Sequence, residues 1–215
     1  MEHVFMNNNF LKAAEELKNI PKSKEIIKHS FKEIIPNKEN ILDTVIFLLL
    51  GTIFAIFMGF SNDTIKIFKE FIGILLNIQL IVFGFIFSIY SIILAFFSDE
   101  YIKKIVRIES ENKETMLKTL LTYYESVLYM YFINVAITGI IEIALLCIPD
   151  DFGLCSNKLL NCFLATFLMS IYNSYSFRVF YELKSTIYNT INIFRTSIAY
   201  RLLSFAENCN KDENK

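Results

Sequence analysis

The chain has 215 residues, of which 54% are hydrophobic and 20% charged, and its formal net charge is −1. A single soluble domain of this length does not need so many apolar residues to fill its core. The near-neutral charge gives no bulk attraction to nucleic acid, so direct nucleic-acid binding is not expected. The composition therefore indicates a protein that places much of its surface in a lipid bilayer.

Residues 1–40 form a polar N-terminal arm with two predicted helices. The first covers 7–19, with an asparagine as its N-terminal cap, and Pro21 ends it. The second, 23–35, is amphipathic, with isoleucines on one side and the basic stripe Lys24, Lys28 and Lys32 on the other. Such a helix either lies on anionic lipid headgroups or packs on the cytoplasmic part of its own oligomer.

Four segments are predicted to span the bilayer, which takes about 20 apolar residues each. They are 41–60, 72–97, 126–148 and 159–177, and the fourth is the most polar. In the first, Gly51, Ala55 and Gly59 recur at steps of four, which favours close contact with another helix. The spacing leaves open whether that helix belongs to the same chain.

Two segments outside the spans have helical patterns. The loop 98–125 contains no Pro or Gly and is predicted to form a helical hairpin below the membrane that turns near Asn112. In 182–205, apolar residues repeat with an eleven-residue period, which drifts little around a helix. A long apolar face should not stay in water, so we expect it to bind a partner or another subunit. The residues of this tail face are Ile187, Ile191, Phe194, Ile198 and Leu202.

The distribution of Lys and Arg predicts the orientation in the membrane. Of the 21 such residues, all but three lie in the arm 1–40, the loop 98–125 or the C-terminal segment 178–215. With four spans these segments share one side, which the positive-inside rule makes the cytoplasm. We expect an all-α, multi-pass protein of the bacterial inner membrane with both termini inside. Its predicted parts are the arm 1–40, a four-helix bundle 41–180 and a cytoplasmic tail 181–215.

A carboxylate, Glu142, interrupts the third apolar segment. Asn134, Thr138 and Glu142 follow one another at steps of four and form a polar stripe on one helix face. Antiparallel packing brings the fourth segment to the same depth, and the second segment adds two amides. A charge facing lipid costs several kcal/mol, so these groups should face protein or water. The predicted polar layer contains Asn77, Gln79, Asn134, Thr138, Glu142 and Thr166.

Three roles for Glu142 fit this position. It is a neutral hydrogen-bond donor between helices, one of a ring of acids around a water-filled path in an oligomer, or an ion- or proton-binding group in a transport cycle. The segments show no repeats or broken helices of the kind that transporters use.

Enzymatic chemistry is not expected. The only histidines, His3 and His29, lie in the arm, and no nucleophile, phosphate-loop or metalloprotease motif occurs. No spacing suggests a metal or cofactor site. Cys147, Cys155 and Cys162 surround the second outer connection, where either one pair forms a disulfide or all three stay free thiols.

The layout resembles the KwaA family, the four-span membrane component of the Kiwa anti-phage defence system. The resemblance is one of architecture along the whole chain: a charged arm, four spans, a helical loop such as SDEYIKKI and both termini inside. It implies a homo-oligomer, such as a tetramer, that senses phage infection, with a cytoplasmic DNA-binding partner protein that blocks phage replication or transcription. Similar layouts occur in pore-forming effectors, so a channel that depolarises the membrane is the alternative; a structural subunit of a larger transporter is a third hypothesis.

Overall fold

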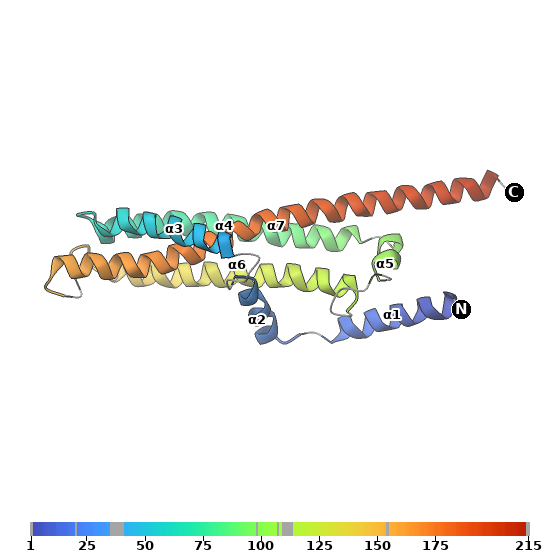
Figure 1. Cartoon of the computed structure of the whole chain (residues 1–215), viewed down its shortest axis with the longest axis horizontal. Coiled ribbons are helices and arrows are strands. Elements are labelled where there is room, and N and C mark those ends of the chain that lie inside the picture. Colours follow the sequence, from blue (N-terminus) through green and yellow to red (C-terminus); the bar gives the residue numbers. More distant parts are fainter. Residues whose placement is uncertain are drawn as a thin grey trace. The chain divides into compact units, whose positions relative to one another are not determined.

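The computed structural model describes residues 2–19, 21–34, 41–97, 99–106, 108, 114–153 and 155–213. These residues form seven helices and no strand (Figure 1). The helices are α1 (Glu2–Lys18), α2 (Ser23–Ile34), α3 (Ile41–Gly59), α4 (Thr64–Phe96), α5 (Asp99–Ile105), α6 (Met116–Leu146) and α7 (Lys158–Glu213). The predicted all-α class is confirmed.

Three helices are long and apolar enough to cross a membrane: α3, α4 over Thr64–Ala95, and α6. Between 17% and 28% of their most apolar stretches is buried within the chain. The rest presents large apolar side chains such as Phe57 and Ile81, which are 78% and 73% exposed. Apolar surface on this scale belongs in hydrocarbon, so the chain is a membrane protein. The fourth predicted span, 159–177, begins α7 and is not among the three.

The chain divides into two compact units. One, which we call the bundle unit, contains 30–85 and 128–184. It comprises α3 and parts of α4, α6 and α7, and α3 runs beside α7 (Figure 1). Its buried apolar cluster comprises Ala55, Met58, Phe68, Ile72, Leu75, Met169 and Tyr172.

The other, which we call the arm unit, contains 1–29, 86–127 and 185–215. It joins α1 and α5 to the second part of α4, the first part of α6 and the second part of α7. Its buried apolar cluster comprises Ala13, Ile89, Ile93, Tyr101, Ile105, Val106, Leu117, Tyr124 and Ile193. The arm, the loop and the tail, which the sequence assigned to separate parts, therefore share one core.

The fourth predicted span and the tail form one uninterrupted helix, α7, of 56 residues. The sequence predicts separate elements because the hydrophobic patterns of the two segments differ. The segment from Lys158 to Glu213 contains no Gly or Pro, so nothing in the backbone stops the helix.

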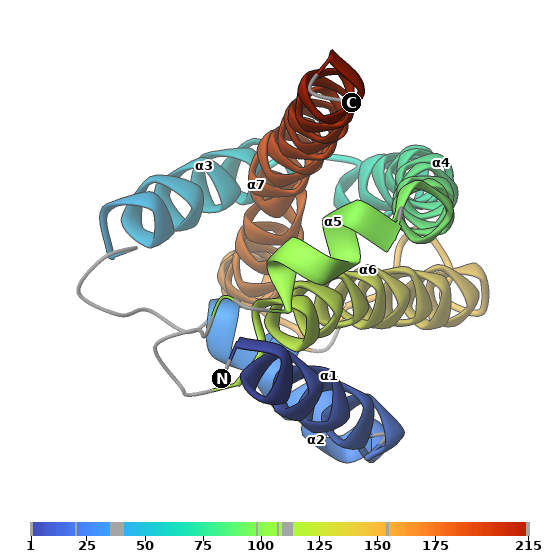
Figure 2. The ribbon, with the colours of Figure 1, turned by 90° about the vertical axis from the view of Figure 1, so that its right-hand side faces the viewer.

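The first arm of the predicted hairpin 98–125 is a short helix that is separate from α4. α4 ends at Phe96, and α5 begins at Asp99 as a separate helix of seven residues. Tyr101, Ile105 and Val106 of this segment are buried at 3%, 5% and 2% exposure in the arm-unit core. Figure 2 shows α5 crossing from the end of α4 towards the N-terminal end of α6. Burial of these side chains therefore outweighs helix continuation, and the predicted turn near Asn112 lies outside the described residues.

The two arm helices were predicted with unequal success. α2 begins at Ser23, as its pattern indicated. α1 extends back to Glu2, so the asparagines at 7–9 lie inside the helix and the predicted N-terminal cap is wrong.

Candidate functional site

Polar side chains of α6 and α7 meet inside the bundle unit. Thr138 Oγ1 donates a hydrogen bond to Asn134 O at 2.8 Å and lies 2.7 Å from Tyr172 Oη. One turn along, Ser176 Oγ donates to Asn134 Oδ1 at 3.3 Å. Two residues four apart on α6, Asn134 and Thr138, thus contact two residues four apart on α7, Ser176 and Tyr172. Residues at this spacing share one face of a helix, so the polar faces of the two helices lie against each other. Thr138, Asn134 and Ser176 are fully buried.

Three amides at this level contain hydrogen-bonding atoms with no partner among the described residues. These are both side-chain amide atoms of Gln79 and of Asn173, and Nδ2 of Asn134. All three side chains are 0% exposed. An unpaired buried polar group lowers the free energy of unfolding by about 1–3 kcal/mol, so these amides destabilise the bundle unit. Because the site is polar, it can hold ordered water.

The depth of Gln79 follows from two contacts between α4 and α6. The rings of Phe83 and Phe132 lie 6.3 Å apart, and Gly73 lies opposite Glu142. The two helices are antiparallel, so Gln79 falls between these contacts, level with the polar residues of α6. The buried polar layer therefore comprises Gln79, Asn134, Thr138, Tyr172, Asn173 and Ser176.

Glu142 lies one turn beyond this layer, between α4 and α6. Its Oε1 is 3.4 Å from the position that a Cβ on Gly73 would occupy, so the glycine leaves room for the carboxylate. The side chain is half-buried and has no hydrogen-bond or ion-pair partner in the part of the chain that the structure describes. Of the other predicted members, Asn77 is exposed, and Thr166 packs against Gly59 of α3. The structure therefore brings together only Gln79, Asn134 and Thr138.

Gly51, Ala55 and Gly59 face α7 of the same chain. A Cβ on Gly51 would lie 2.4 Å from Ser174 Oγ and 2.5 Å from its backbone N, and one on Gly59 would lie 2.1 Å from Thr166 Oγ1. Ala55 is 0% exposed. The small residues thus allow the two helices to approach closely.

Thr166, which was expected to join Glu142, lies on a face of α7 that meets α3 instead. Ser170 Oγ lies 2.7 Å from Thr52 Oγ1, and Ser174 donates to Leu48 O at 3.4 Å. The α7 residues that reach the polar stripe of Asn134 and Thr138 are Tyr172 and Ser176, which were not among the predicted residues. Their step of four, antiparallel to Asn134 and Thr138, is the signal that could have identified them.

The tail face remains largely exposed. Ile187, Ile191, Ile198 and Leu202 are 40%, 49%, 57% and 63% exposed. Phe194, by contrast, packs against the core of the arm unit. One residue of the tail face therefore packs within its own arm unit, and the other four are exposed and can contact another protein.

The N-terminal arm is fastened to the start of α6. Glu16 Oε2 accepts hydrogen bonds from the backbone N of Thr115 at 3.0 Å and from its Oγ1 at 2.7 Å. Because α6 begins at the next residue, the carboxylate lies where the helix dipole favours a negative charge. His29 adds a second contact, with Nδ1 3.1 Å from Ser126 Oγ. No local sequence pattern identifies Glu16, because its partner lies about a hundred residues away.

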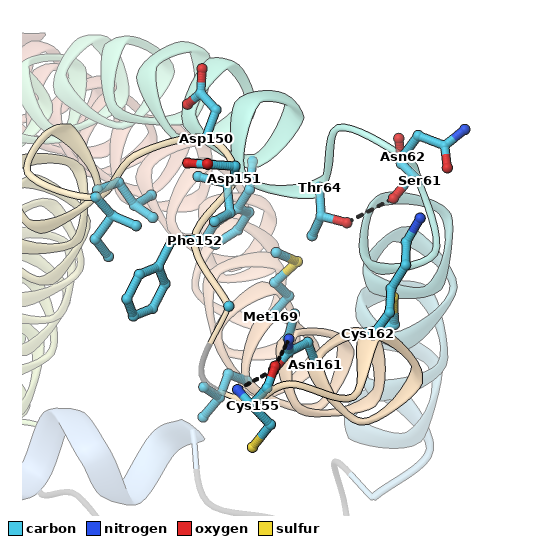
Figure 3. Close-up of a pocket in the computed structure, with 18 of the residues that line it drawn as sticks. Ser61, Asn62, Thr64, Asp150, Asp151, Phe152, Cys155, Asn161, Cys162 and Met169 are labelled. Carbon is cyan, nitrogen blue, oxygen red and sulfur yellow. Dashed lines mark hydrogen bonds between the residues drawn. The ribbon is translucent and has the colours of Figure 1, made fainter.

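A cavity lies at the end of the bundle unit where the α3–α4 and α6–α7 connections meet. We call it the loop cavity; its volume is about 730 Å³. In Figure 3, Asp150, Asp151 and Phe152 lie across it from Asn62 and Thr64. Tyr172, whose hydroxyl contacts Thr138, also lines it, so the cavity adjoins the buried polar layer.

The structure contains neither a disulfide among the three outer cysteines nor, among the described residues, a cluster of metal ligands. Cys147, Cys155 and Cys162 are free thiols in the structure. Within the described ranges, no group of three or more His, Cys, Asp or Glu side chains is placed to hold a metal ion.

Comparison with known proteins found no match: no protein family fits the sequence, and no curated protein and no solved structure is significantly similar to it.

Proposed function

We propose that this chain is the membrane-embedded scaffold or sensor subunit of a bacterial anti-phage defence complex, and that it recruits a cytoplasmic partner protein to the inner membrane. The defence role is supported by the resemblance of the layout to the KwaA family. The scaffold role is carried by one observation, the exposed tail face on the part of α7 in the arm unit. An apolar face that lies in none of the three candidate spans needs a protein to cover it.

Four spans with both termini in the cytoplasm are part of the proposal. The first part of α7 follows α3 from end to end: Phe60 meets Phe163 with ring centroids 5.5 Å apart, and Phe47 meets Tyr181 at 5.0 Å. A helix packed along α3 in this way lies at the depth of α3. Its outward side chains are apolar and more than half exposed, namely Leu159, Leu160, Phe163, Phe167, Leu168 and Ile171.

The tail face also supports assembly into a homo-oligomer. Its eleven-residue period lets helices from several copies wind around one another with a slight right-handed supercoil. Ile187, Ile191, Ile198 and Leu202 then meet their equivalents in neighbouring copies, while Phe194 keeps α7 on its own arm unit.

The test is the double variant Ile191→Asp with Ile198→Asp. Both side chains are exposed, so membrane insertion and the thermal unfolding of the subunit should not change. Light scattering in detergent should show a smaller assembly, and the protein encoded by the neighbouring gene should no longer be captured. Thr196→Asp, on the opposite and exposed side of α7, is the matched control.

The same variants decide the biological role. In bacteria that carry the gene with its neighbours, the double variant should lose protection against phage, and Thr196→Asp should keep it. Full assembly and full protection in the double variant would overturn the proposal. Ion conductance by the purified protein in vesicles would instead favour the channel.

A further inference from the structure

The loop cavity has an apolar wall. Phe68 of α4, Ile141 and Leu145 of α6, and Met169 and Tyr172 of α7 form it. The volume of about 730 Å³ lies within the range of about 300–1,000 Å³ that small-molecule sites occupy. Burying a hydrocarbon chain against such a wall is favourable, whereas burying a polar group there without a partner is costly.

The mouth of the cavity carries charge of both signs. Lys69 donates to Asp150 Oδ1 and to Ile148 O, both at 2.7 Å, so the charges of this pair compensate. Asp151 and Lys158 also line the cavity, and neither has a hydrogen-bond or ion-pair partner among the residues that the structure describes. A ligand with one positive and one negative group complements them.

Hydrogen bonds hold the rim of the mouth in shape. Asn161 accepts from the backbone N of Cys155 at 2.8 Å and donates to its O at 2.7 Å (Figure 3). A Cβ on Gly153 would come within 2.6 Å of Asn161 Nδ2, so a side chain at this position would displace the amide that holds the rim. Asn157 Oδ1 accepts from the backbone N of Leu159 at 3.0 Å and caps α7. A rim ordered before binding reduces the entropy that a ligand must overcome.

The apolar wall is continuous with the outer surface of the bundle unit. Leu168 lines the cavity and is also 55% exposed, beside Phe167 and Ile171. On α6, Ile140 and Ile143 share an exposed face, and the lining residue Ile141 lies between them in the sequence. Because these exposed faces belong in hydrocarbon, an acyl chain can pass from the bilayer into the cavity without crossing water.

We propose that the loop cavity binds one phospholipid of the surrounding bilayer, of the zwitterionic aminophospholipid class. One acyl chain lies against the wall of Phe68, Leu145 and Met169. The ammonium group of the lipid binds Asp151, and its phosphate binds Lys158. This site depends on the embedding of the bundle unit in a membrane and is independent of the defence role.

Cysteine labelling tests the site in the unmodified protein. Cys162 lines the cavity, whereas Cys147 is exposed and does not. The protein is placed in vesicles of phosphatidylglycerol alone or of phosphatidylglycerol with phosphatidylethanolamine, and N-ethylmaleimide labelling of each cysteine is followed by mass spectrometry. Phosphatidylethanolamine should slow the labelling of Cys162 several-fold relative to phosphatidylglycerol alone and leave that of Cys147 unchanged. Equal Cys162 rates in the two kinds of vesicle, as a second copy of the chain or a water-soluble ligand in the cavity would give, would overturn the proposal.

Charge variants test the headgroup contacts. In mixed micelles of the two lipids, native mass spectrometry should find one phosphatidylethanolamine retained per chain. Asp151→Asn and Lys158→Gln should each weaken its retention by up to about fivefold, the effect of an exposed charge pair. Asp63→Asn is the control, because Asp63 lies in the neighbouring turn, is exposed and does not line the cavity. Unchanged retention in both cavity variants, or an equal loss in the control, would contradict the headgroup assignment.

Discussion

The two units of this chain treat their buried polar groups in opposite ways. In the bundle unit, both amide atoms of Gln79 and of Asn173 are buried without a partner among the described residues. In the arm unit, Tyr124 Oη lies 2.9 Å from Thr190 Oγ1, which in turn donates to Thr186 O at 2.7 Å. In the part of the chain that the structure describes, every fully buried side-chain polar atom without a partner lies in the bundle unit.

The surfaces of the two units show why they differ. The bundle unit presents apolar side chains outwards, such as Phe57 and Ile81, and hydrocarbon around them is as apolar as its core. Little hydrophobic driving force then holds the helices together, so close contacts between small residues stabilise them. The arm unit gains stability by burying Ile93, Tyr101 and Leu117 and by pairing its polar groups. Packing thus dominates in one unit, and apolar burial with hydrogen bonding dominates in the other.

The largest effect is expected from the double variant Gly51→Leu with Gly59→Leu, which breaks the packing of the bundle unit. Even a Cβ would lie 2.4 Å from Ser174 at one site and 2.1 Å from Thr166 at the other. The free energy of unfolding should fall by about 1–3 kcal/mol per site, as measured by thermal unfolding in detergent. Gly84→Leu is the matched control, since nothing lies within 4 Å of a Cβ there. Equal stability of the double variant and the control would mean that α3 and α7 are not in contact.

Replacing Gln79 with Met, which has a similar shape, should stabilise the bundle unit, in contrast to the glycine variants. The change removes two buried polar atoms that have no partner among the described residues, so stability should rise by about 1–3 kcal/mol. Thermal unfolding measures this change, and phage protection is assayed in parallel. A stabilised protein without protection would assign the buried polar layer to function. A loss of stability would show that Gln79 has a partner in the assembled protein.

In the arm unit, removing a buried polar group should lower the stability of the protein, because the buried groups there have partners. Tyr124→Phe removes the hydroxyl that bonds to Thr190, which should cost about 1 kcal/mol of unfolding free energy. Tyr188→Phe is the control, because that ring is 65% exposed and its hydroxyl has no hydrogen-bond partner among the described residues. If the two variants unfold at the same temperature, the contrast between the units fails.

The smallest effect is expected from the substitution Glu142→Gln. Glu142→Gln keeps the shape of a side chain that has no partner in the described part of the chain, so stability and phage protection should not change. Glu142→Leu should cost on the order of 1–2 kcal/mol if Glu142 bonds across a helix interface in the assembled protein. Conductance of reconstituted protein provides the second readout. A flux that the Gln variant alters would place Glu142 beside a water-filled path.

Several features followed from the sequence alone because they depend on neighbouring residues. The helical class and the three most apolar helices follow from long, strongly apolar runs that contain few charges and no Pro. The steps of four at Gly51, Ala55 and Gly59 identified a small-residue face, since residues four apart share one side of a helix. The polar stripe of Asn134 and Thr138 was found in the same way.

Which neighbour each face meets was decided only by the tertiary structure. Asn77 and Gln79 are two residues apart and point to nearly opposite sides of α4, so one is exposed and the other buried. Thr166 lies on the α7 side that meets α3, and Tyr172 and Ser176 lie on the side that meets α6. The contact of Glu16 with Thr115 and the burial of Tyr101 likewise depend on long-range packing. Helical periodicity determines which residues share a face, whereas contacts between segments far apart in the chain determine what that face binds.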